Sequence, residues 1–153
     1  MPLTRRELCL LFPAAGVSSA MLSAGAVAAA SAEQDSSLPS ATFPFDQLPL
    51  NKPSGGAEAR PVLKGKLATG ESLEVHETML APGGMPHPPH HHAHSEMWLI
   101  REGTVEITIN GVNHRLGPGG VGFVRSNDEH GIKNVGATPA NYFVVAIGPG
   151  AGS

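Results

Sequence analysis

Residues 104–116 read TVEITINGVNHRL, two alternating runs of apolar and polar residues on either side of Asn110-Gly111. Asn-Gly is the strongest short signal for a two-residue hairpin turn, because both central residues take positive φ. The turn places His114 on the apolar face, as a hydrogen-bonded core histidine or as a group lining a ligand cavity. The predicted cross-strand pairs are Ile109–Val112, Thr108–Asn113, Ile107–His114, Glu106–Arg115 and Val105–Leu116.

Further short runs surround this hairpin, rich in Val, Ile, Leu, Phe and Thr and separated by Gly, Pro and Asn. None shows a sustained helical repeat. With 19 glycines and 14 prolines in 153 residues, the chain is expected to form an all-β barrel or sandwich. The predicted strands outside the hairpin are 62–68, 72–80, 97–100, 121–124, 130–134 and 142–147.

Residues 1–32 are predicted to be a signal peptide, with Arg5 and Arg6 before an uncharged stretch that ends in an A-x-A pattern at Ala32. The paired arginines resemble a bacterial twin-arginine signal, and ordinary Sec export or an uncleaved membrane anchor are the alternatives. We therefore expect export to the bacterial periplasm or the cell exterior. Cleavage would remove Cys9, the only cysteine, and leave a mature protein with no disulfide and no membrane span.

The remaining chain divides into a Pro/Ser/Gly-rich arm over 33–60, a barrel over 61–148 and a tail over 149–153. The arm carries several large apolar residues, so we expect it to pack on the barrel or on a neighbouring subunit; a disordered tail is the alternative. The formal net charge is −3, and no basic run follows the first ten residues, which argues against nucleic acid as a partner.

Residues 90–96, HHHAHSE, lie between an APGG turn and the strand expected at 97–100. Side chains two apart on a strand point the same way, with Cα atoms about 6.6 Å apart, so two such imidazoles can bind one ion. A third imidazole from a distant strand would complete a site, and His130 opens a late strand. A loose surface tract that buffers metal is the alternative. The residues that would point the same way, each two positions from the next, are His90, His92, His94 and Glu96.

This pattern resembles the cupins, a family of small jelly-roll β-barrels. Their first motif is a Gly, five residues, His, one residue, His, three or four residues, Glu, six residues and Gly. The residues that fit it are Gly84, His90, His92, Glu96 and Gly103.

The second cupin motif is matched at Gly119, His130 and Asn134. Arg125 stands where a proline is usual, which is expected to loosen the turn that leads to His130. Asn127 stands where a glycine is usual, a mild change because Asn tolerates positive φ.

The resemblance implies a small jelly-roll barrel that holds one divalent transition metal, of which Fe, Mn, Ni, Cu, Co and Zn all suit the ligands. The implied ligands are His90, His92, Glu96 and His130. Glu96 either binds the ion or acts as the catalytic base. A barrel that only packs these side chains, without metal, is the alternative.

Other side chains near the motifs have two interpretations each. His87, His91 and His94 are expected to be solvated loop histidines, or else to orient the ligands. The aromatic and aliphatic candidates for the pocket wall, or for ordinary core packing, are Trp98, Phe123, Ile132 and Phe143.

Three functions agree with these features. The first is a metal-dependent enzyme, similar to the dioxygenase cupins, that acts on a small oxygen-rich or aromatic molecule. The second is a lyase, isomerase or decarboxylase on the same barrel, and the third is a binding protein that captures a small ligand without turnover. A homodimer is expected, because exposed strand edges need cover.

Overall fold

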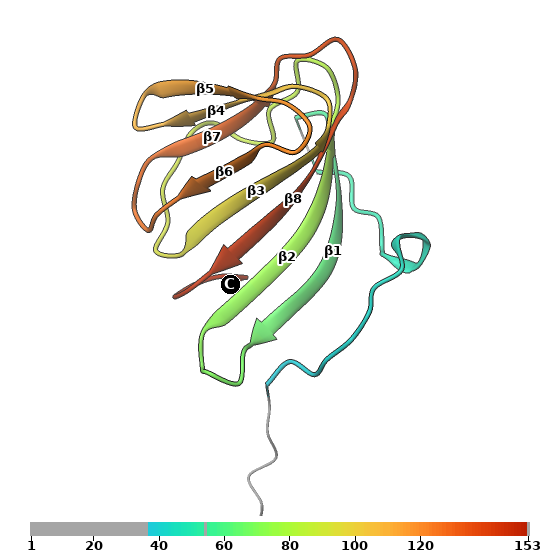
Figure 1. Cartoon of the computed structure of the whole chain (residues 1–153), viewed down its shortest axis with the longest axis vertical. Coiled ribbons are helices and arrows are strands. Elements are labelled where there is room, and N and C mark those ends of the chain that lie inside the picture. The colour runs from blue at the N-terminus through green and yellow to red at the C-terminus, as the bar shows by residue number, and fades with distance from the viewer. Residues whose placement is uncertain (1–36, 54, 153) are drawn as a thin grey trace, which may run out of the picture. The chain divides into compact units, whose positions relative to one another are not determined.

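The computed structural model describes residues 37–53 and 55–152, so the predicted signal peptide at 1–32 lies outside the described residues. Nearly all of the regular structure is β-strand (Figure 1). Among the described residues no helix is long and apolar enough to cross a membrane. The elements are the 3₁₀-helix η1 (Phe45–Gln47) and the strands β1 (Ala57–Lys66), β2 (Ser72–Leu80), β3 (Ser95–Glu102), β4 (Val105–Ile109), β5 (Val112–Leu116), β6 (Val121–Val124), β7 (His130–Asn134) and β8 (Ala140–Ile147).

The strands form two antiparallel sheets, one with the order β1-β2-β8-β3-β6 and one with the order β5-β4-β7. Figure 1 shows β5 and β1 at the two extremes of the view, with the other strands between them. The all-β jelly-roll predicted from the sequence is confirmed. Alternation along β8 places Ala140, Tyr142, Val144 and Ala146 in the buried core and their neighbours on the other face.

The β4–β5 hairpin has all five predicted cross-strand pairs. Its turn residues take positive φ, 48° at Asn110 and 78° at Gly111, as the Asn-Gly signal requires. His114, however, is exposed, so the interpretation as a core histidine is wrong. Because β5 is an edge strand, no further strand covers His114 on that side, and His114 lines a surface groove together with residues of β6.

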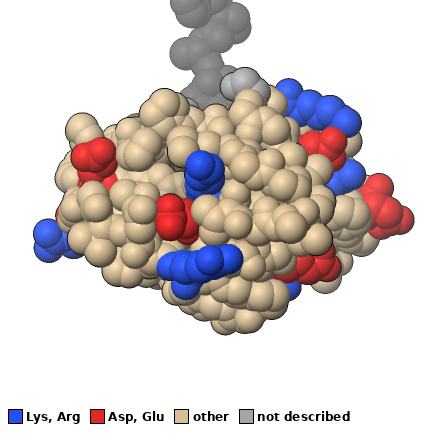
Figure 2. All heavy atoms as spheres, turned by 90° about the horizontal axis from the view of Figure 1, so that it is seen from above, with Lys and Arg blue, Asp and Glu red and all other residues tan. Residues whose placement is uncertain are grey.

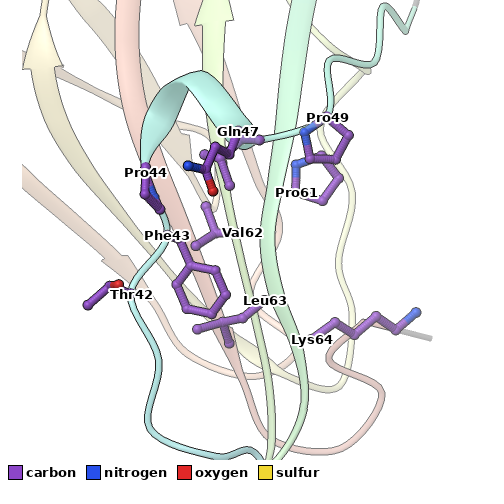
Figure 3. A pocket seen from close by; sticks show the side chains of 10 residues that line it. Thr42, Phe43, Pro44, Gln47, Pro49, Pro61, Val62, Leu63 and Lys64 are labelled. Carbon is purple, nitrogen blue, oxygen red and sulfur yellow. The ribbon is translucent and has the colours of Figure 1, made fainter.

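The described part of the arm, residues 37–53, lies along β1. The Leu38 N–H donates to the Lys66 carbonyl at 2.7 Å, and Asn51 and Ala59 exchange two backbone hydrogen bonds of 2.8 Å. Figure 3 shows Phe43 of the arm beside Leu63 of β1. The disordered-tail alternative therefore fails for these residues, and the arm covers the edge of β1.

The strand β1 itself begins at Ala57, within the segment that the sequence analysis assigned to the arm. Arg60 of β1 fixes the arm with its side chain, since Nη1 donates to the Leu48 carbonyl at 2.8 Å. Its guanidinium also lies 4.7 Å from the centre of the Phe45 ring, within cation–π range.

Candidate metal centre

His90 and His130 lie opposite each other although forty positions separate them in the chain. They form an isolated antiparallel bridge, in which the His90 N–H donates to the His130 carbonyl at 2.9 Å and the His130 N–H to the His90 carbonyl at 2.8 Å. Their ring centres are 4.8 Å apart. The backbone thus brings the two predicted motifs to one point.

His92 completes a cluster of three imidazoles. Its ring centre lies 5.2 Å from that of His90 and 4.6 Å from that of His130. One nitrogen from each ring lies within 4.8 Å of the others, a spacing that can hold a metal ion. The structure therefore brings together the three histidines that the sequence analysis proposed as ligands.

The hydrogen bonds of two of these rings fix which nitrogen can bind an ion. The Nδ1–H of His92 donates to the His94 carbonyl at 2.9 Å, and that of His130 donates to the Asp128 carbonyl at 2.9 Å. A carbonyl only accepts, so in the neutral rings Nε2 carries the lone pair. This is the outer-shell arrangement that orients a metal-binding histidine.

Two nitrogens of the cluster are buried and have no hydrogen-bond partner, His130 Nε2 and His90 Nδ1. Buried polar atoms are nearly always satisfied, so an unpartnered pair calls for an explanation such as an ion. Burial, followed by the nearby His87 and the other imidazoles, lowers the pKa of His90 to about 4. At neutral pH His90 is therefore uncharged, the form that binds a transition metal.

Glu96, in β3, contacts one imidazole of the cluster directly. Its Oε2 lies 3.1 Å from His92 Nε2 and 3.9 Å from His94 Nε2. Because the Nδ1–H of His92 donates to a carbonyl, Nε2 of the neutral ring carries a lone pair. This lone pair would face the Glu96 carboxylate unless a proton or a cation lies between them. Glu96 groups with His92 and His94 rather than with His90 and His130, so its place as fourth ligand stays a prediction.

The loop histidines differ in their surroundings. His94 stacks on His92 with ring centres 3.5 Å apart, and its side chain is only 16% exposed, so the solvated-loop interpretation is wrong for it. His87 is exposed but contacts the ring of His90 edge-on at 4.2 Å. His91 is exposed, as expected. The one sequence signal for the position of His94 was its spacing of two residues from His92, which would point both side chains the same way.

The turn before His130 is closed despite the arginine in it. Arg125 Nε donates to Asp128 Oδ2 at 2.9 Å, and the Asp128 N–H donates to the Arg125 carbonyl at 3.2 Å. Asn127 takes φ 65°, as predicted, and its N–H donates to the His92 carbonyl at 2.8 Å. His130 is 1% exposed, so the expectation that Arg125 loosens its positioning is wrong.

A cavity of about 290 Å³ is lined by residues that lie next to the cluster. Two of its lining residues contact the cluster directly. Glu96 contacts His92, and His87 contacts His90. Trp98 lines the cavity as well, with its ring centre 5.5 Å from that of His130. The lining residues are Pro53, Ala57, Ala59, His76, Thr78, Pro86, His87, Glu96, Trp98, Ile132, Tyr142 and Val144.

The pocket-wall candidates from the sequence divide into two pairs. Trp98 and Ile132 line the cavity and belong to the buried core as well, so both of their interpretations hold. Phe123 is 57% exposed, and Phe143 lies on the opposite face of β8 from Val144. Neither phenylalanine reaches the cavity.

These features define a β-barrel with a three-histidine centre beside an internal cavity. Residues 76–146 match the cupin domain family. The chain is thus similar to this family over residues 76–146, and its jelly-roll fold agrees with that similarity. L-ectoine synthase of Bordetella petrii is 38% identical over 63 residues, which are 40% of this chain and 47% of that protein. The chain thus spans about half the length of this curated relative.

Solved structures share the fold at low sequence identity. A RmlC-like cupin from Shewanella frigidimarina matches with TM-score 0.61 and 20% identity, over 72% of this chain and 94% of that chain. A predicted oxalate decarboxylase from Thermotoga maritima matches with TM-score 0.61 and 20% identity, over 71% and 99%. A polyketide cyclase from Streptomyces resistomycificus matches with TM-score 0.57 and 17% identity, over 71% and 80%. At these identities the likeness concerns the fold.

Proposed function

We propose that the protein is a metal-dependent enzyme, similar to the dioxygenase cupins, that acts on a small oxygen-rich or aromatic molecule. The observation that carries this proposal is the pair of buried, unpartnered nitrogens of His90 and His130 next to a cavity. A centre that only packed its histidines would leave these atoms unsatisfied at a cost in stability. A bound ion would give both nitrogens a partner.

The residues that would hold a divalent transition metal are His90, His92 and His130, with Glu96 as the fourth ligand. When bound, such an ion supplies Lewis-acid activation of a substrate oxygen or, if redox-active, activation of dioxygen. Glu96 borders both the cavity and His92, which supports the alternative in which its carboxylate does not bind the ion and instead accepts a proton from a bound substrate. The carbonyls that hold the Nδ1 protons of His92 and His130 keep those two rings oriented.

A second candidate is a non-oxidative reaction on the same barrel, catalysed by a lyase, isomerase or decarboxylase. The similarity to L-ectoine synthase, 38% identical over 63 residues, favours this class. A protein that binds a small ligand without turnover is the third candidate. Oxygen uptake during product formation separates the first class from the second, and formation of any product excludes the third.

The metal content of protein purified without a His tag tests the centre itself. We expect about one equivalent of a divalent transition metal in the parent protein, and its loss in both His92→Ala and His130→Ala. His91→Ala is the matched control, because His91 lies between two proposed ligands and is exposed. Retention of metal by His130→Ala would point to the surface tract of histidines and contradict the proposed centre.

Export and dimerisation are further proposals. Export is supported by the paired arginines and the A-x-A pattern before residue 33. Homodimerisation is supported by exposed apolar side chains on the outer strands, including Val121 at 55% and Phe123 at 57%. Light scattering should give twice the chain mass, and Phe123→Glu should halve it if this surface forms the interface.

The charged groups fit a small-molecule partner rather than a polyanion. On the face shown in Figure 2, acidic and basic side chains are interspersed, and neither sign gathers into a patch. Together with the net charge of −3, this supports the expectation that nucleic acid is not a partner.

A further inference from the structure

We propose that the cavity beside the histidine cluster takes a neutral molecule with a single ring and a hydroxyl group directed at the cluster. The direction of the hydroxyl rests on the proposed function, whereas the neutral ring rests on the cavity alone. Most of the wall is apolar or aromatic, with Trp98, Ile132 and Val144 each at most 5% exposed. Flat apolar surfaces of this kind favour a ring over an extended polar chain.

The charged side chains of the cavity wall bear on the charge of the ligand. Neither lysine nor arginine occurs among the described residues that line it, and the carboxylate there is Glu96. A remote carboxylate or phosphate would lose its water without gaining a lysine or arginine as a partner, so a neutral ligand is favoured.

Two hydroxyls and one imidazole nitrogen of the wall already have partners. Tyr142 and Thr78 face each other across β2 and β8 and share a side-chain hydrogen bond. His76 Nδ1 lies 3.2 Å from Glu74 Oε1. The polar side chains nearest the cluster are Glu96 and His87, which contact His92 and His90. A ligand hydroxyl is therefore best placed at that end.

The size of the cavity sets the size of the ligand. An apolar cavity of about 150 Å³ holds benzene, so about 290 Å³ leaves room for one ring with short substituents. The small side chains of Ala57 and Ala59 on β1 give the cavity its width. A longer side chain at Ala59 should fill part of this space.

Two probes of similar shape and different charge test the inference, 4-ethylphenol and 4-hydroxyphenylacetate. Binding is followed by the fluorescence of Trp98, the only tryptophan of the chain, excited where phenols do not absorb. We expect 4-ethylphenol to bind about tenfold or more tightly than the acid, because a buried carboxylate would be unpaired. Ala59→Leu should abolish binding, and Ala59→Val should weaken it by a smaller factor. If the leucine variant does not fold, the valine variant provides the test.

Ala68→Leu is the matched control, because Ala68 is exposed in the turn between β1 and β2, and it should bind as the parent does. Metal-free protein and His130→Ala should still bind 4-ethylphenol. The ligand inference can therefore hold even if the metal proposal fails. Equal or tighter binding of the acid would overturn the inference. Unchanged binding in folded Ala59→Leu would overturn it as well.

Discussion

His90 and His130 are joined by two backbone hydrogen bonds, of 2.9 and 2.8 Å, that tie the loop before β3 to the start of β7. Because β3 belongs to the five-stranded sheet and β7 to the three-stranded sheet, the histidine cluster lies where the two sheets are held together. An ion bound by both histidines would bind the folded state and not the unfolded chain. Metal binding and stability should therefore be linked.

Metal should raise the melting temperature only when the cluster is complete. For a metal concentration a hundred times the dissociation constant, the expected gain is about 2.7 kcal/mol. His130→Leu removes a buried nitrogen that has no partner without metal, so the variant should fold but gain nothing from metal. Calorimetry of metal-free and metal-loaded samples measures this, with His91→Leu as control. An equal gain in His130→Leu would contradict the link.

Gly103 should tolerate alanine poorly. It has φ +79°, and an added Cβ would lie 2.6 Å from the Ala140 Cα, closer than any real contact. Gly111 has a similar φ of +78° but nothing within 4 Å, so Gly111→Ala carries only the backbone strain, about 1 to 2 kcal/mol. Urea unfolding should show a clearly larger loss for Gly103→Ala. Equal losses would mean that the contact with Ala140 relaxes freely.

Arg101 should stabilise the protein through Glu77, a carboxylate that is 5% exposed and forms an ion pair with it. Arg101→Met keeps the apolar stem but leaves this buried charge without its cation, at an expected cost of about 2 kcal/mol. Lys52 pairs with Glu58 at 2.7 Å but is 67% exposed, so Lys52→Met should cost less than about 1 kcal/mol. The two variants are compared by denaturant unfolding at low salt, and similar costs would argue against a role for burial.

Tyr142, the only tyrosine, should make the protein sensitive to alkali. Burial and then the charge of Glu96 raise the pKa of its phenol in the folded state. Below about pH 10 the phenol is protonated in both states, and above it only the unfolded chain releases the proton. The free energy of unfolding should thus fall as the pH rises, by up to about 1.4 kcal/mol per unit.

Absorbance of the phenolate tests this directly, because one residue gives the whole signal. It should appear together with the loss of native circular dichroism, and Tyr142→Phe should lack the extra pH dependence. Phenolate formation in protein that keeps its native spectrum would show that the phenol titrates freely.

Local signals were sufficient for much of the fold. The Asn110-Gly111 turn and the alternation around it predicted the register of β4 and β5, because both depend on residues close in sequence. The predicted runs at 72–80, 112–116, 121–124 and 130–134 coincide with strands. Asn127 was also predicted to take positive φ, which is a property of one residue and its turn.

Local sequence patterns were enough to predict most of the strands, the hairpin register and the spacing of the histidines within each motif. Only the tertiary structure decided what covers each side chain: His114 is exposed because no layer covers the edge strand β5, whereas His94 is shielded by stacking on His92. The physical reason is that periodicity fixes which face of a strand a side chain occupies, while its burial depends on residues far along the chain. The contact of Glu96 with His92, and the absence of lysine and arginine from the described residues of the cavity wall, likewise depend on the tertiary structure.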